Sequence, residues 1–153
     1  MRALGAQLSQ AGAKRLDDEM LLTSAEIKTK LMMRADVARC ASLFRGGPGG
    51  GLMPLLELLE PEELDQFFEV IYQSTVAELL ESPAARNADS ARVEETMRII
   101  LDDLPETERE RLRAGLIKGV GDNDEETCWM GRTLQQGINR LDREDRIQWI
   151  LLQ

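Results

Sequence analysis

Apolar residues recur at helical spacing along almost the whole chain, and no segment sustains the alternation of apolar and polar residues that is typical of a β-strand. The clearest helix is predicted over residues 61–81, which open on a proline and then carry one broad apolar face. We expect that face to contain Leu64, Phe67, Phe68, Ile71, Tyr72, Thr75, Val76, Leu79 and Leu80. The pattern therefore predicts an all-α protein.

Capping residues and helix breakers divide the rest of the chain into further helices. A weak helix is expected over residues 3–20, and a stronger one starts at the capping box formed by residues 23–26, Thr-Ser-Ala-Glu. The second helix should run to about Phe44 and stop at Gly46. Later helix starts are predicted at Pro54, Pro61, Ser90, Pro105, Asp122 or Asn123, and Asp142.

These segments predict a single α-helical domain over residues 1–153. We expect a bundle of seven or eight short to medium helices joined by proline and glycine corners. The glycine-rich residues 46–51 are interpreted as a flexible loop, because six residues are more typical of a connection than of a boundary between domains.

The two cysteines and the N-terminus bear on the compartment. Cys40 and Cys128 form no CxxC motif, and two cysteines alone do not complete a tetrahedral metal site. The N-terminal residues lack the unbroken apolar run of a signal peptide, and no apolar run is long enough to span a bilayer. We therefore expect two reduced thiols in a cytoplasmic protein that does not bind a membrane.

The chain has no histidine, which excludes Ser-His and Cys-His catalysis and any metal or haem site that depends on imidazole. The remaining enzymatic hypothesis is a metal-dependent all-α phosphohydrolase that uses the carboxylates of Glu57, Glu60, Glu78 and Glu81. Glu78 falls on the apolar side of its helix, so it needs an arginine partner, a metal ion or a position at a frayed helix end. No cofactor is expected, and the protein is predicted not to be an enzyme.

Acidic residues are concentrated in one part of the chain. The net charge is −9, yet residues 1–51 hold 8 basic and 5 acidic side chains. Between Arg45 and Arg86 there is no lysine or arginine and there are eight acids. The candidate acidic patch within this stretch consists of Glu57, Glu60, Glu62, Glu63, Asp65 and Glu69.

Two interpretations of the acidic patch are open. It is either a solvated helix face or a surface that attracts a basic protein partner, including one whose basic surface normally binds nucleic acid. Direct nucleic-acid binding is not expected, because the sequence pI is about 4.6 and no basic stripe is present.

The C-terminal helices carry apolar residues on more than one side. Trp129 lies off the main apolar stripe of its helix, and Trp149 and Leu152 point almost opposite to Ile147 and Leu151. The second side packs either on the rest of the domain or on another chain, and tryptophan is common at protein interfaces. Trp129, Trp149 and Leu152 are therefore candidate contact residues, with a homodimer through the last helix as one option.

The sequence favours a small acidic helical adaptor, inhibitor or regulatory protein that acts by binding another protein. The alternatives are the carboxylate phosphohydrolase and a self-assembling structural subunit.

Overall fold

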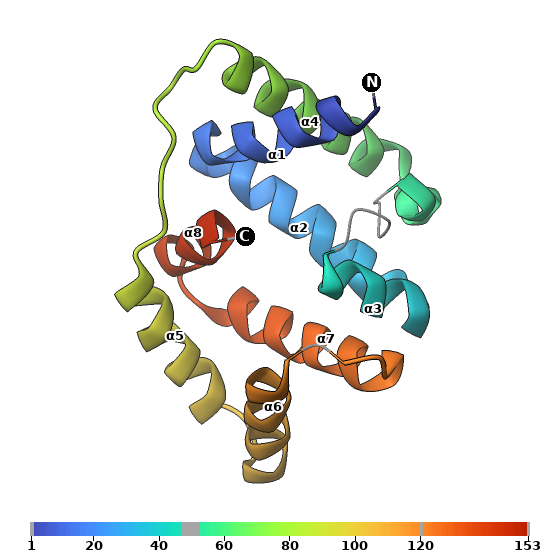
Figure 1. Cartoon of the computed structure of the whole chain (residues 1–153), viewed down its shortest axis with the longest axis vertical. Coiled ribbons are helices and arrows are strands. Elements are labelled where there is room, and N and C mark those ends of the chain that lie inside the picture. Colours follow the sequence, from blue (N-terminus) through green and yellow to red (C-terminus); the bar gives the residue numbers. More distant parts are fainter. Residues whose placement is uncertain (1, 47–52, 120, 153) are drawn as a thin grey trace.

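The computed structural model describes residues 2–46, 53–119 and 121–152, and within these ranges it contains eight α-helices and no strand (Figure 1). The α-helices are α1 (Arg2–Gly12), α2 (Asp18–Arg34), α3 (Val37–Arg45), α4 (Pro61–Leu79), α5 (Ser90–Asp102), α6 (Glu106–Lys118), α7 (Asp124–Arg140) and α8 (Arg143–Leu152). The predicted all-α bundle is confirmed, at the upper end of the expected number of helices. None of these helices combines the length and the apolar character that crossing a membrane requires.

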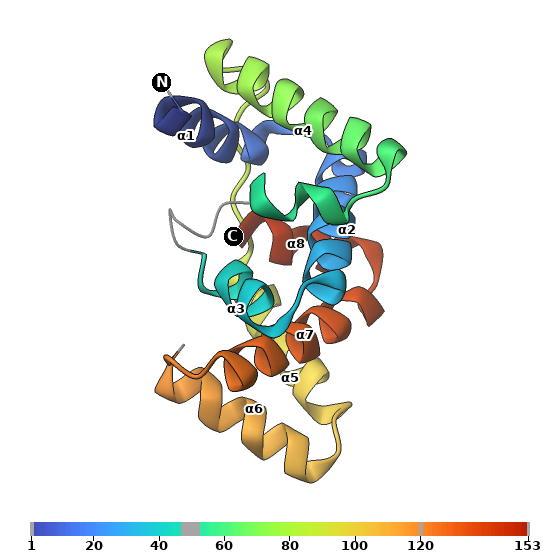
Figure 2. The ribbon, with the colours of Figure 1, turned by 90° about the vertical axis from the view of Figure 1, so that its right-hand side faces the viewer.

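α2 lies in the middle of the molecule and contacts helices on several sides. Figures 1 and 2 show α1 and α4 side by side at one end, α3, α7 and α8 around the centre, and α6 at the opposite end. The close approach of α1 to α4 depends on Gly12, since a Cβ atom there would lie 1.8 Å from the backbone oxygen of Ser74.

The core consists of three apolar clusters. The largest joins α2, α3, α4 and α7 around Leu31, Cys40 and Phe67. A second cluster packs Leu21 of α2 against Val70 of α4 and the buried side of α8, and a third packs α5 against α7 and α8. Leucine, isoleucine, valine and methionine supply most of the buried apolar side chains, as expected for a chain with few aromatic residues.

Two predicted boundaries in the N-terminal third are wrong. The first helix ends at Gly12 and is followed by a short 3-10 turn, Ala13–Arg15, rather than continuing to residue 20. The next helix, α2, begins at Asp18 rather than near Thr23, because the carboxylate of Asp17 accepts a hydrogen bond from the Met20 amide at 2.8 Å. The expected long helix is also interrupted: α2 ends at Arg34, and Asp36 caps α3 by accepting from the amide of Arg39 at 2.9 Å.

Most other predicted boundaries are confirmed. Gly46 ends α3 with a φ of 65°, α4 begins at Pro61, and Pro105 precedes α6. Asn123 and Asp142 accept hydrogen bonds from amides in the first turns of α7 and α8. The cap of α5 is Asp89, one residue before the expected Ser90, and the segment after Pro54 belongs to a 3-10 helix, Met53–Leu58. Residues 47–51 of the predicted flexible loop lie outside the described residues.

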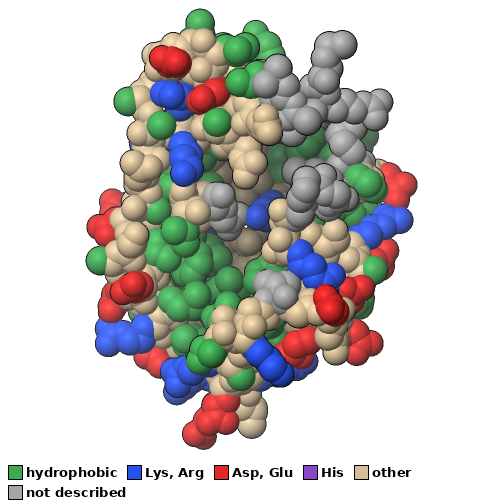
Figure 3. Space-filling view, in the orientation of Figure 1, with side chains coloured by type: hydrophobic (Ala, Val, Ile, Leu, Met, Phe, Trp, Pro, Cys, Tyr) green, Lys and Arg blue, Asp and Glu red, His purple; other side chains and the backbone are tan. Residues whose placement is uncertain are grey.

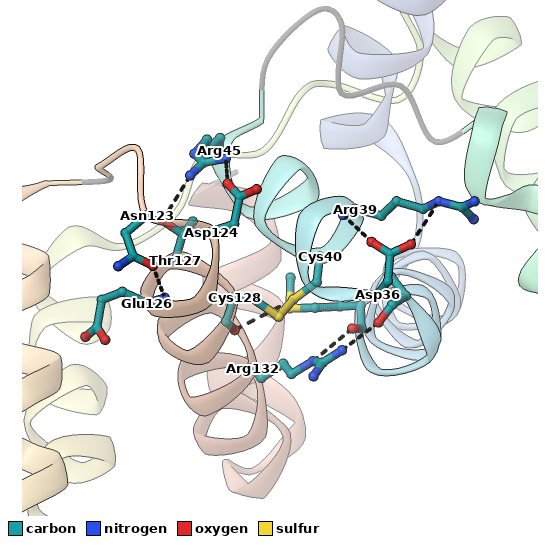
Figure 4. The surroundings of a disulfide bond; sticks show 12 residues. Asp36, Arg39, Cys40, Arg45, Asn123, Asp124, Glu126, Thr127, Cys128 and Arg132 are labelled. Atoms are coloured by element: carbon teal, nitrogen blue, oxygen red, sulfur yellow. Dashed lines mark hydrogen bonds and ion pairs between the residues drawn. A yellow bond between two sulfur atoms is a disulfide. The ribbon is translucent and has the colours of Figure 1, made fainter.

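Cys40 and Cys128 form a disulfide that joins α3 to α7 (Figure 4). The two helices pack closely here, and the Cα atoms of the two cysteines are 5.3 Å apart. Nearby, Arg132 joins α7 to the C-terminal end of α2 by donating hydrogen bonds to the backbone oxygens of Met32, at 3.2 Å, and Ala35, at 2.7 Å. The prediction of two reduced thiols is therefore wrong, because residues 88 positions apart in sequence are brought together by helix packing that the sequence pattern does not reveal.

Candidate protein-binding surface on α4

One side of α4 is fixed to the rest of the molecule. Phe67, Val70 and Ser74 are buried, and the hydroxyl of Ser74 lies 2.8 Å from that of Ser9 on α1. Near the other end of the helix, Arg15 donates from Nε to Glu78 at 2.8 Å. This ion pair confirms the arginine-partner interpretation of Glu78, and it helps to determine which face of α4 is turned outward.

The outward face of α4 carries large apolar side chains. Phe68 is 50% exposed, Tyr72 61%, Leu79 65% and Leu80 68%. Phe68, Tyr72 and Leu79 are spaced i, i+4 and i+11, which places them along one line of the helix. The sequence places these four residues on the broad apolar face of the helix, and they are exposed because α1 and α2 cover only part of that face.

Three carboxylates lie beside this apolar line. Glu62, Asp65 and Glu69 are exposed, and none of them forms an ion pair with a described residue. Asp65 precedes Phe68 by one helical turn and Glu69 precedes Tyr72 by one turn, so each aromatic ring has a carboxylate as its neighbour. We call the set Glu62, Asp65, Phe68, Glu69, Tyr72 and Leu79 the α4 outer surface.

The other acids of the predicted patch are placed differently. Glu57 is exposed but paired with Arg39 at 2.8 Å, and the backbone amide of Glu60 donates to Glu63 at 2.9 Å at the start of α4. Bases from the net-positive N-terminal third thus neutralise part of the acidic stretch. The open acidic area is smaller than the sequence suggests, and it is concentrated on α4.

Glu63 is the most strongly stabilised carboxylate of the stretch. It is buried and accepts hydrogen bonds from Arg34 at 2.5 and 3.0 Å, while Lys30 lies 3.0 Å away. The Arg34 guanidinium, the Glu60 amide and the Lys30 ammonium together lower the pKa of Glu63 to about 2. Glu63 therefore holds α4 against α2 and is not part of the open acidic surface.

Trp149 is buried, which removes it from the candidate contact surface. Its indole is 6% exposed, packs in the cluster of Val93, Ile100 and Ile138, and donates from Nε1 to the hydroxyl of Thr96 at 2.9 Å.

The opposite side of α8 packs on α2 and α4 through Ile147 and Leu151. Both apolar sides of α8 are thus covered within one chain, and only Leu152, 51% exposed, remains at the surface. The pattern that suggested a homodimer has an explanation inside the monomer.

Trp129 is half-buried on α7, and α2 and α3 lie between this helix and α4 (Figure 1). The guanidinium of Arg111 lies 3.9 Å from the centre of its ring and pairs with Glu126 at 2.5 Å. Trp129 therefore packs against Arg111 of α6 and does not form one surface with the acids of α4.

The carboxylates proposed for a phosphohydrolase are not brought together. Glu57 and Glu60 precede α4, whereas Glu78 and Glu81 lie at its far end, about 28 Å along a helix of 19 residues. No group of three or more potential metal-ligating side chains occurs among the described residues. This arrangement gives no support to the phosphohydrolase hypothesis.

The chain matches no known protein family, no curated protein and no solved structure. Its function is therefore argued from its own residues. Sequence reasoning identified Glu62, Asp65 and Glu69 but missed Phe68 and Tyr72 as surface residues. The sequence did contain a signal for their exposure. The apolar face of this helix is wider than one or two neighbouring helices can cover, so part of it must stay exposed.

Proposed function

We propose that the protein is a non-enzymatic binding protein, an adaptor or inhibitor, that uses the α4 outer surface to bind a protein partner with a basic and partly apolar surface. The observation that carries this proposal is the line of exposed Phe68, Tyr72 and Leu79 beside three carboxylates without ion pairs in the described residues. Exposed aromatic groups at a solvated surface are more typical of recognition sites than of an inert helix face.

The charge of the segment determines the chemistry of the partner. No lysine or arginine occurs between Arg45 and Arg86, and the three carboxylates that border the aromatic line form no ion pair with bases elsewhere in the described residues. An acidic border favours approach of a basic surface and disfavours an acidic one. The aromatic rings would supply the buried contact area, and the carboxylates would supply orientation and a fast association rate.

The compartment is a separate question from the binding surface. Cytoplasmic location stays a prediction, and the Cys40–Cys128 disulfide argues for an oxidising compartment instead, because disulfides are rare where glutathione and thioredoxin keep thiols reduced. Alkylation of free thiols in protein from its native source distinguishes the two: two blocked cysteines indicate an oxidising compartment, and two alkylated cysteines indicate a reducing one.

Selection of random peptides displayed on phage tests the binding surface and does not require an identified partner. Peptides would be selected on the wild-type chain alone and then tested for binding to Phe68→Ser/Tyr72→Ser. Ile99→Ser/Ile117→Ser is the matched control, since those two isoleucines are exposed on α5 and α6. We expect enriched peptides that combine arginine or lysine with large apolar residues and that bind the control variant as well as the wild type. Enrichment of peptides that bind the Phe68/Tyr72 variant equally well would contradict the proposal.

A further inference from the structure

A cavity of about 610 Å³ lies between α2, α7 and α8, outside the α4 outer surface. Its walls combine the large apolar side chains of Leu22, Ile138, Trp149 and Ile150 with three basic ones, those of Lys28, Lys30 and Arg146. Cavities of this size, mostly apolar and with a few polar groups, are typical of sites for small organic ligands. On the face of the molecule drawn in Figure 3, hydrophobic side chains also gather beside a hollow near the middle.

Arg146 brings an unsatisfied positive group to this cavity. Its Nε atom is buried and has no hydrogen-bond partner among the described residues, and its guanidinium forms no ion pair there. A buried donor of a charged group without an acceptor is costly, so an anion that reaches it would bind favourably.

Lys28 places a second positive charge at the same cavity. Its side chain also lines the neighbouring cavities of about 300 Å³, toward α1 and α4, and about 210 Å³, toward α3. Burial lowers the pKa of Lys28, because the charged ammonium loses water. A counter-charge in the cavity would therefore stabilise the protonated form.

Basic residues outnumber acidic ones in the lining of this cavity. Glu26 is the only carboxylate among the described residues that line it, and Glu26 pairs with Lys30 at 3.1 Å. Lys30 in turn lies 3.0 Å from Glu63. The lining therefore has an excess of positive charge in an otherwise acidic protein.

We propose that this cavity binds a small amphiphilic anion, whose carboxylate is held by Arg146 and Lys28 and whose apolar body packs against Trp149 and Ile138. The guanidinium offers parallel N–H donors that suit a carboxylate, and the apolar walls favour an aliphatic or aromatic body over a fully hydrated ion. This site is independent of the α4 outer surface.

Trp149 provides the readout, since its indole lines the cavity. In Trp129→Phe, which leaves Trp149 as the sole tryptophan, decanoate is titrated below its micelle concentration with decanol and decyltrimethylammonium as uncharged and cationic controls. We expect a saturable change of Trp149 emission with decanoate and at least about tenfold weaker binding of the two controls. No saturable change with decanoate, or equal binding of decanol, would overturn the proposal.

Matched variants locate the bound anion. In the Trp129→Phe background, Arg146→Gln should weaken decanoate binding by about tenfold or more, whereas Arg113→Gln, an exposed arginine on α6 without an ion pair in the described residues, should leave it unchanged. Ala25→Phe, which narrows the cavity without altering charge, should also abolish binding. Far-ultraviolet circular dichroism checks that each variant is folded. Equal decanoate affinity in folded Arg146→Gln and Arg113→Gln would reject the site.

Discussion

Individual side chains that look alike in the sequence have different roles in the structure. Glu62 and Glu63 are adjacent acids, yet Glu62 is exposed while Glu63 is buried against Arg34 and Lys30. Trp129 and Trp149 are both apolar residues off a simple stripe, yet only Trp149 is fully packed. The difference depends on helices that are remote in sequence, so spacing within one helix does not predict it.

Glu63 gives the protein a defined sensitivity to acid. Because its pKa in the folded state is about 2, below the ordinary value of 4.5, the stability it contributes is fully present above pH 4.5 and is lost as the pH falls toward 2. In Glu63→Gln we expect a lower Tm at neutral pH and a shallower fall of Tm between pH 5 and pH 2.5. Thermal unfolding followed by circular dichroism measures both, with Glu62→Gln as the control that should keep the wild-type slope. An unchanged slope in Glu63→Gln would contradict this assignment.

Trp149 is expected to matter for stability rather than for binding. Trp149→Ala removes a buried indole and its hydrogen bond to Thr96, and should lower the free energy of unfolding by about 3–5 kcal/mol. Leu152→Ala, at an exposed position of the same helix, should change it by less than about 1 kcal/mol. Urea unfolding measures both values, and a near-neutral Trp149→Ala would show that the indole is not part of the core.

At the scale of the helices, prolines and capping residues predicted well which segments are helical, but they predicted the helix boundaries less evenly. Proline at the start of α4 gave a correct start, and the start of α7 was predicted to within one residue, since both Asp122 and Asn123 can cap a helix. The capping box at residues 23–26 failed, because Asp17 caps the helix earlier and the helix must include Leu21 to bury it. The break at Asp36 was missed because the apolar pattern continues through it.

The start of α3 at the Asp36 cap can be tested directly by mutation. Asp36→Ala should lower the free energy of unfolding by about 1 kcal/mol, since it removes the acceptor of the Arg39 amide. Thr23→Ala, within α2, should cost less than about 0.5 kcal/mol, because Thr23 does not cap a helix. Chemical denaturation measures the pair, and a larger loss in Thr23→Ala would reverse the assignment.

At the scale of the whole molecule, the sequence predicted the all-α class and the acidic stretch but not which parts meet. The ion pairs of Glu57 and Glu63 with bases of residues 30–39 and the disulfide between α3 and α7 are long-range contacts. The exposed line of α4 also depends on such contacts, since it is defined by the side that α1 and α2 leave uncovered.

The disulfide should contribute strongly to global stability. It joins residues separated by 88 positions, so it restricts the unfolded chain over more than half of its length. Cys40→Ala/Cys128→Ala should lower the free energy of unfolding by about 2–5 kcal/mol, and a reducing agent should have the same effect on the wild type only. Urea unfolding with and without reductant tests this, and a wild type that is insensitive to reductant would contradict it.

The central claim is that the α4 outer surface binds a basic partner, and calorimetric titration of a peptide selected on the wild-type chain tests it most directly. The titrated proteins are the wild type, Glu62→Gln/Asp65→Asn/Glu69→Gln, and the matched control Glu94→Gln/Glu110→Gln/Glu125→Gln, whose exposed acids lie on other helices. We predict that neutralising the α4 acids weakens binding on the order of tenfold, whereas the control variant keeps the wild-type affinity. Raising the salt concentration from about 50 to about 300 mM should also weaken binding to the wild type. Equal affinity of all three proteins, independent of salt, would contradict the account.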